Sequence, residues 1–152
     1  MKNLPLQRAS IEPRLDGIQR DLVLLERYSE LAFKEFNDPV ILDRTHLRLR
    51  FVLEGTYHIG AHILSRIPGG RFTEYREIAQ KLGEYGIVPR EFAQQKLVPM
   101  AGYRNRLTHL YAQVSVEELH EILKNHLGDV VFFIKRIKDV LEAPEKFGLT
   151  IE

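Results

Sequence analysis

A chain of 152 residues has the usual length of one domain and can bury roughly two thirds of the surface that its unfolded form exposes. It contains no cysteine, which excludes a disulfide framework, a thiolate metal site and a cysteine nucleophile. Its 22 basic and 21 acidic residues nearly balance, so no overall field draws the protein onto nucleic acid or an anionic membrane. Any contact with nucleic acid must therefore be local.

The start of the chain shows no pattern typical of secretion. The first fourteen residues hold Pro5, Pro13 and scattered charges, without the apolar core that a signal peptide requires. No run approaches the roughly eighteen apolar residues of a membrane span. We therefore expect a cytoplasmic protein without membrane contact. We take residues 1–152 as a single helical domain, with residues 1–11 and 144–152 as flexible or peripheral tails.

Two long helices are predicted in the first half of the chain. Apolar residues recur at three- and four-residue steps from Leu15 to Phe36, which indicates one helix that ends at Asn37-Asp38-Pro39. A second helix is expected from near Asp43 to about Arg66, with a stripe of residues four apart: Leu47, Phe51, Gly55, Ile59 and Ile63. Gly55 in this stripe would let a neighbouring helix approach closely. Residues 67–70 form a turn.

The middle of the chain leaves one alternative open. Thr73 is expected to cap a short helix over residues 74–85. Another helix begins at Pro89, and Pro99 either lies within that helix or splits off a separate one over residues 101–108. Since no strand alternation or internal repeat occurs, the predicted fold class is all-α, an antiparallel bundle of four or five helices.

The clearest capping sequence precedes the last helix. Ser115 followed by Glu118 has the spacing of a capping box, in which the serine accepts a backbone N–H and the glutamate reaches back. Apolar residues over 116–141 form a wide face of one long helix. Phe132 and Phe133 are adjacent, so only one of them can face that stripe. The other is a candidate for packing against a second subunit.

An unusual density of polar groups lies between two apolar helices, over residues 103–111. It includes Arg104, Asn105, Arg106 and His109. Imidazole transfers protons near neutral pH, and guanidinium stays charged and presents a planar fork to phosphate oxygens. These two groups suit cleavage of a phosphodiester by the internal 2′-hydroxyl of RNA, which needs no metal-activated water. The alternative, cap and dipole partners at a helix end, stays open at this point.

Helical geometry separates these side chains. At about 100° per residue, Arg104, Thr108 and Tyr111 fall on one side of a helix, while His109 lies about 140° round from Arg104. One helix therefore cannot direct Arg104 and His109 at one point. They converge only if the helix ends near Thr108 or if two copies of the chain face each other across a symmetric interface.

The segment Met100-Ala101-Gly102-Tyr103-Arg104-Asn105-Arg106-Leu107-Thr108-His109-Leu110-Tyr111 resembles a known motif. An arginine, four residues, a histidine, one residue and a tyrosine are typical of the HepT family within the HEPN superfamily. The resemblance covers roughly residues 12–142. It includes Ile59-Gly60-Ala61-His62-Ile63-Leu64, Tyr75, Leu82, Gly86-Ile87-Val88 and the long apolar last helix.

The resemblance implies an HEPN-like antiparallel bundle that forms a homodimer, in which two motifs line one cleft. It further implies a ribonuclease that cleaves RNA without a metal ion or another cofactor. Carried over to this chain, Arg104 would bind phosphate, His109 would transfer protons, and Asn105 would orient one of them.

Family members are typically toxins encoded beside a MntA-like nucleotidyltransferase antitoxin. That partner silences the toxin by transferring AMP from ATP to the motif tyrosine, which here is Tyr111. A bulky anionic adduct near Arg104 would occupy the phosphate site and repel RNA.

Residues outside the motif are assigned by their types and spacing. We expect Arg48, Glu54, His58 and Thr108 to support the cleft. His58 and His62 are four apart on the second helix, but no carboxylate completes a metal-ligand set, so we expect a partly buried pair rather than a metal site.

His120 and His126 of the last helix are expected to lie on its polar side, in solvent.

Two rival functions accompany the ribonuclease hypothesis. The first is a non-catalytic helical module that binds a nucleotidyltransferase partner and a nucleotide. The second is a purely structural bundle. The polar cluster over residues 103–111 makes this second function less favoured.

Overall fold

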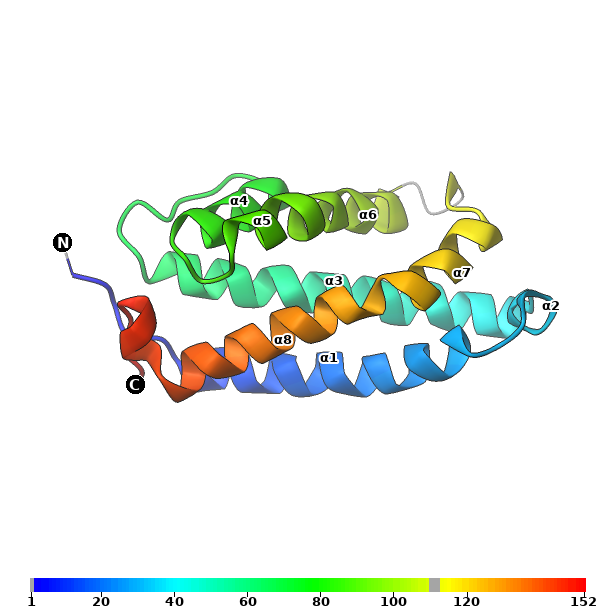
Figure 1. Cartoon of the computed structure of the whole chain (residues 1–152), viewed down its shortest axis with the longest axis horizontal. Helices are drawn as coiled ribbons and strands as arrows, with labels where there is room; N and C mark the ends of the chain where they lie inside the picture. The colour runs from blue at the N-terminus through cyan, green and yellow to red at the C-terminus, as the bar shows by residue number, and fades with distance from the viewer. Residues whose placement is uncertain (1, 110–112) are drawn as a thin grey trace.

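The computed structural model describes residues 2–109 and 113–152. The helices in this part of the chain are α1 (Arg8–Ser29), α2 (Phe33–Phe36), α3 (Pro39–Ser65), α4 (Tyr75–Glu84), α5 (Arg90–Phe92), α6 (Val98–His109), α7 (Val116–Asn125) and α8 (Leu127–Glu142). Along the long axis of the molecule, α1, α3, α6 and the α7–α8 pair run antiparallel to their neighbours (Figure 1). In these residues only an isolated bridge, Leu6 to Ile151, resembles a strand pair, and the all-α prediction is confirmed.

The first helix differs from its predicted bounds at both ends. α1 begins before Leu15 and keeps Pro13 in its interior. Phe36 was expected on the same helix but lies in the separate α2, and Ala32 before it is exposed. The break turns α2 back, so that the buried ring of Phe36 stacks on His120 with 4.8 Å between centroids. The buried residues of α1 follow the predicted spacing: Ile11, Leu15, Ile18, Leu22 and Leu25.

The long helix α3 begins earlier than predicted because it has a strong cap. The carboxylate of Asp38 accepts hydrogen bonds from the N–H groups of Val40 and Ile41, both at 3.1 Å, and a proline follows at the first helical position. The predicted stripe is wrong at Leu47 and Phe51, which are 41% and 42% exposed. Residues four apart advance about 400° around a helix, so such a row drifts about 40° per step and leaves the core.

Two glycines of α3 let neighbouring helices come close. A Cβ atom added at Gly55 would lie 2.9 Å from Cγ1 of Ile18 in α1, which confirms the close approach predicted there. At Gly60 an added Cβ atom would lie 2.8 Å from Cγ2 of Ile78 and 2.9 Å from Cδ1 of Leu82, both in α4. Because these distances are shorter than a normal contact, α3 packs on α1 and α4 through backbone at these two points.

The run from α5 to α6 is continuous and contains one wide turn. Residues Ala93–Leu97 are π-helical, and the N–H of Val98 donates to the carbonyl of Ala93. Pro99 therefore does not split this run. The carbonyl that its ring would otherwise contact, four residues earlier at Gln95, lies within the wider turn.

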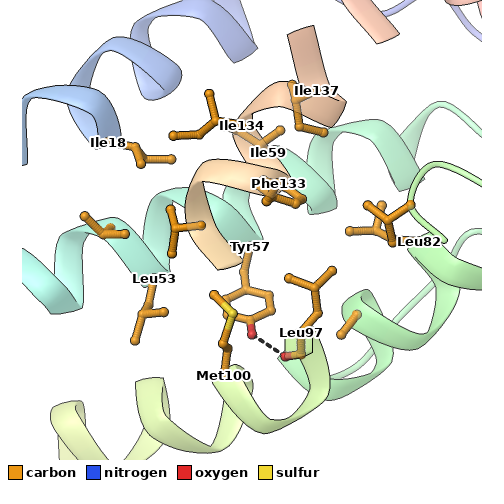
Figure 2. Packing of buried hydrophobic residues seen from close by; sticks show 14 of the residues in the cluster. Ile18, Leu53, Tyr57, Ile59, Leu82, Leu97, Met100, Phe133, Ile134 and Ile137 are labelled. Atoms are coloured by element: carbon orange, nitrogen blue, oxygen red, sulfur yellow. Dashed lines mark hydrogen bonds between the residues drawn. The ribbon is translucent and has the colours of Figure 1, made fainter. Parts of the chain in front are cut away.

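A buried tyrosine ties this turn to α3. The hydroxyl of Tyr57 donates to the carbonyl of Leu97 at 2.6 Å (Figure 2). The ring of Tyr57 also stacks on Tyr75 of α4, with 5.2 Å between centroids. Burial raises the pKa of the Tyr57 phenol, so the hydroxyl keeps its proton and its role as donor.

The two predicted caps have different outcomes. Ser115 accepts the N–H of Glu118 at 3.1 Å, which confirms the serine half of the capping box. The Glu118 carboxylate is bonded to Arg106 of α6 instead of reaching back. The Thr73 prediction is wrong, because its hydroxyl bonds to the Glu77 side chain and α4 begins after Glu74 without a side-chain cap.

The last predicted helix is two helices. The chain bends at His126, where φ is −122° and ψ is −6°, and α8 begins at the next residue. Phe133 is fully buried, whereas Phe132 is 42% exposed and packs on Phe92 with ring centroids 4.5 Å apart. Only one of the two adjacent phenylalanines therefore faces the core, as expected.

The two chain ends lie side by side at one end of the bundle (Figure 1). The N–H of Leu6 donates to Thr150, and the N–H of Glu152 donates to Leu6, at 2.8 and 2.9 Å. Leu6 and Leu149 are buried in the same apolar cluster as the helices. The described parts of both end segments are therefore packed against the bundle.

Replacing Gly60 with alanine tests the close packing of α3 on α4. The added methyl group overlaps Cγ2 of Ile78, which is attached near the backbone and cannot swing away. We expect Gly60→Ala to lower the free energy of unfolding by about 1–3 kcal/mol, measured by urea denaturation. Gly128→Ala in α8 is the control, since no atom lies within 4 Å of its added Cβ. Equal stability of the two variants would contradict this packing.

Candidate functional site

The polar motif occupies the second half of α6, where the helix is held by its apolar face. Met100, Ala101 and Leu107 of α6 are buried against the bundle. The remaining positions direct the motif side chains toward α3, toward α7 or into solvent. The structure describes α6 as far as His109, and Tyr111 lies outside the described residues.

Arg104 faces inward and is held by two other helices. Its Nη2 lies 3.5 Å from Oε1 of Glu54 in α3, and its guanidinium carbon lies 4.4 Å from the ring centre of Tyr75 in α4. Its Nη1 donates to Oδ1 of Asn105 at 3.4 Å. Only 17% of the Arg104 side chain is exposed, so the guanidinium is pre-positioned at the edge of the bundle.

Glu54 is shared between two cations. Its Oε1 lies 3.5 Å from Arg104 Nη2 and 3.9 Å from Arg50 Nε. The buried Nε of Arg104 has no hydrogen-bond partner among the described residues. One carboxylate thus serves two guanidinium groups, and the local charge stays positive.

Arg106 of the same motif has a structural role. Its Nη2 donates to Oε2 of Glu118 at 2.9 Å and to the carbonyl of Gln113 at 3.3 Å. Its guanidinium carbon lies 5.8 Å from the ring centre of Tyr103. Arg106 therefore links the end of α6 to α7 and points away from Glu54.

Arg104 and His109 differ in their exposure within one chain. α6 is helical through His109, one residue past Thr108. His109 is exposed at the last residue of the helix, whereas Arg104 is turned inward. Thr108 is half-buried, and its hydroxyl has no hydrogen-bond partner among the described residues.

Three residues expected to support the cleft line one groove between α1 and α3. Arg48, Glu54 and His58 border a volume of about 380 Å³. The groove lies beside Arg104, because Glu54, which lines it, contacts Arg104. Partial burial and then the charge of Arg14 lower the pKa of His58; Arg104 adds to this and Glu54 opposes it.

The other wall of this groove was missed by sequence reasoning. It comes from α1, where Arg14, Arg20 and Asp21 line the same volume. Asp21 accepts a hydrogen bond from Nη1 of Arg48 at 3.3 Å. Burial raises the pKa of Asp21, and the Arg48 charge partly offsets this. No spacing in the sequence joins α1 to residues some thirty positions later, so only the packing of α1 on α3 reveals the wall.

The remaining histidines have structural partners. Nε2 of His62 accepts the N–H of Gln7 at 3.1 Å, which joins α3 to the chain start. His120 is 8% exposed, and its Nε2 donates to the carbonyl of Leu31 at 2.9 Å, so its expected place in solvent is wrong. Across residues 2–109 and 113–152, no three histidine, aspartate or glutamate side chains are grouped to hold a metal ion. No helix within these ranges is long and apolar enough to span a membrane.

Comparison with known proteins links the chain to one family. Residues 18–137 match the family described as Ribonuclease HepT-like. The chain is 27% identical over 140 residues to a tRNA nuclease HepT of Aphanizomenon flos-aquae, covering 90% of this chain and 92% of that protein. It is 28% identical over 122 residues to a putative RNase of Archaeoglobus fulgidus, covering 80% of this chain and 90% of that protein.

Solved structures show the same fold at lower identity. One is a chain from the crystal structure of a toxin–antitoxin with AMP-PNP, with a TM-score of 0.77 and 21% identity over 86% of this chain and 98% of that one. Another is the cytosolic protein of unknown function YutE from Bacillus subtilis, with a TM-score of 0.78 and 20% identity over 90% and 92%.

The partly buried histidines of α3 predict a loss of stability in acid. Burial lowers the pKa values of His46, His58 and His62, so below pH about 6.5 the unfolded chain binds more protons than the folded one. The free energy of unfolding should therefore fall as the pH decreases from 7 to 5. Protonation of His62 also removes the acceptor for Gln7. His62→Gln keeps an acceptor that does not titrate, and denaturation at constant ionic strength should show a smaller fall; an unchanged fall would refute this role.

Proposed function

We propose that this chain, which belongs to the HepT-like ribonuclease family, is a ribonuclease toxin that cleaves RNA without a metal ion. The observation that carries the proposal is the fixed position of Arg104, held by Glu54 and Tyr75 five residues before a solvent-exposed His109. The relatives named as a tRNA nuclease and a putative RNase support RNA as the substrate class.

The proposed chemistry uses the ribose 2′-hydroxyl as the nucleophile. His109 accepts its proton as the oxygen attacks the adjacent phosphorus, and the bond from phosphorus to the 5′-oxygen breaks. A second group, such as a protonated imidazole, donates a proton to the leaving 5′-oxygen. The products are a 2′,3′-cyclic phosphate and a 5′-hydroxyl. Arg104 stabilises the extra negative charge on the phosphorane. Asn105 orients Arg104 through the contact at 3.4 Å.

We place the working site where two copies of the chain meet. Within one chain α6 turns Arg104 inward and leaves His109 exposed at its end. A symmetric dimer brings His109 of one copy toward Arg104 of the other and supplies two imidazoles to one cleft. The exposed apolar side chain of Leu47 on α3 supports a homodimer contact at this helix.

We further propose control by a MntA-like nucleotidyltransferase antitoxin. The phenol oxygen of Tyr111 attacks the α-phosphorus of ATP, AMP is transferred to the tyrosine, and pyrophosphate leaves. The added phosphate lies seven positions after Arg104 in the chain, where its charge competes with RNA phosphate. The structural neighbour from a toxin–antitoxin with AMP-PNP supports a partner that handles an adenine nucleotide.

Loss of cleavage on two substitutions tests the ribonuclease. We expect unmodified protein to cut a generic RNA in the presence of a chelator, and Arg104→Ala and His109→Ala to lower the rate about 100-fold or more. Gel analysis of end-labelled RNA measures the rate, and intact mass confirms that each protein is unmodified.

The matched controls are Arg27→Ala and His126→Ala, which remove the same side chains far from the motif in the sequence and should retain the activity. Circular dichroism shows that each variant is folded. Absence of cleavage by unmodified wild-type protein would refute the proposal and favour the non-catalytic binding module.

Mass spectrometry tests the proposed regulation. Incubation with the nucleotidyltransferase and ATP should add adenylyl groups to the wild-type chain and abolish RNA cleavage, because the adduct carries negative charge to the phosphate site. Tyr111→Phe should remain unmodified and active, since it has no phenol oxygen to attack ATP. Tyr103→Phe is the control and should be modified like the wild type. An adenylyl group on Tyr111→Phe would show that the modified residue lies elsewhere.

A further inference from the structure

Three arginines outside the motif line the groove between α1 and α3. Arg14 and Arg20 project from α1, and Arg48 projects from α3 on the opposite wall. The whole chain carries a net charge of only +1, so this concentration of cations is a local feature. Basic side chains along a groove are the usual means of following a nucleic acid backbone.

The carboxylates of the groove do not neutralise all of these cations. Asp21 pairs with Arg48 at 3.3 Å, and Glu54 pairs with Arg104 at 3.5 Å. Arg14 donates a hydrogen bond to the carbonyl of Ser10. This bond satisfies one N–H of the guanidinium but does not neutralise its charge. Arg14 and Arg20 therefore provide positive charge beyond what Asp21 and Glu54 balance.

Glycine makes the floor of the groove open. Gly17 of α1 lines it and carries no side chain that would fill it. Nη2 of Arg20 lies 3.9 Å from the position that a Cβ atom of Gly17 would take. The guanidinium of Arg20 thus lies over this open floor, where a phosphate can reach it.

The groove leads directly to the proposed catalytic arginine. Glu54 borders the groove and contacts Arg104 in the same place. His58, one turn further along α3, and Arg14 of α1 line the same groove. A strand of nucleic acid with one phosphate at Arg104 can therefore place a neighbouring phosphate beside His58 and Arg14.

We propose that the α1–α3 groove binds the phosphates of single-stranded RNA that flank the cleaved bond, with Arg14 and Arg20 as the main contacts. Arg48, held by Asp21, adds a third contact from the opposite wall. This rests on the proposed ribonuclease activity and adds residues outside the motif to its substrate site. The volume of about 380 Å³ suits a length of backbone rather than a single small anion.

Binding to an RNA that cannot be cut tests the groove without relying on catalysis. The probe is a fluorescent 2′-O-methyl oligouridylate, which lacks the attacking hydroxyl. We expect Arg14→Ala and Arg20→Ala each to weaken binding several-fold in fluorescence anisotropy. Each should also reduce the slope of log affinity against log salt by about 0.7, the value for one phosphate contact on a single strand.

Lys138→Ala is the matched control, since it removes one exposed positive charge from α8, outside the groove. If Arg14→Ala and Arg20→Ala bind the probe like Lys138→Ala, the proposal is wrong. Variants that bind RNA normally but lose the nucleotidyltransferase would also overturn it and assign the groove to a protein partner.

Substrate length supplies the second test. With a long RNA, Arg20→Ala should raise KM and leave kcat nearly unchanged. The reason is that flanking contacts stabilise the bound substrate and the transition state equally. With a dinucleoside monophosphate, which has only the cleaved phosphate, Arg20→Ala should match the wild type. An equal loss on both substrates would place Arg20 at the cleaved bond and overturn the flanking site. If the wild type cuts no RNA, the ribonuclease proposal fails, while the binding measurement still decides the groove.

Discussion

The close packing of α3 against three neighbours is the constraint on which the rest of the molecule depends. Gly55 brings α1 into contact, Gly60 brings α4 into contact, and the Tyr57 hydroxyl holds the turn before α6. Each of these contacts places a wall or a side chain of the candidate site. Because a packed interior allows little adjustment, the positions of Arg104 and the α1 arginines follow from this one helix.

The two arginines of the motif have different ion-pair partners, and these partners set their orientations. Glu54 of α3 and the ring of Tyr75 hold Arg104 at the bundle edge, while Glu118 draws Arg106 of the same motif toward α7. Two arginines two positions apart thus have opposite surroundings, one beside the groove and one at a helix junction. For the site, the effect of these ion pairs is to orient the guanidinium groups.

The near-neutral composition is compatible with RNA binding because the charge is unevenly distributed. The α1–α3 groove gathers arginines from two helices beside the motif, and its two carboxylates are already paired with Arg48 and Arg104. A local cation cluster of this kind can attract a polyanion while the rest of the surface stays balanced. It also gives the motif a substrate path that its own few residues could not provide.

Local and periodic features of the sequence were sufficient to predict the helical class, the Ser115 cap and the motif on α6, because each depends on residues close together in the sequence. The absence of a side chain also indicated a close approach at Gly55, but the helix that approaches it is set by the tertiary structure. The exposure of Leu47, the burial of His120 and the diversion of Glu118 from its cap to Arg106 required the tertiary structure. The presence of the α1 arginines in the groove also required the tertiary structure. Those features depend on which distant helix lies opposite a residue, and that is decided by the packing of the whole bundle rather than by spacing along the chain.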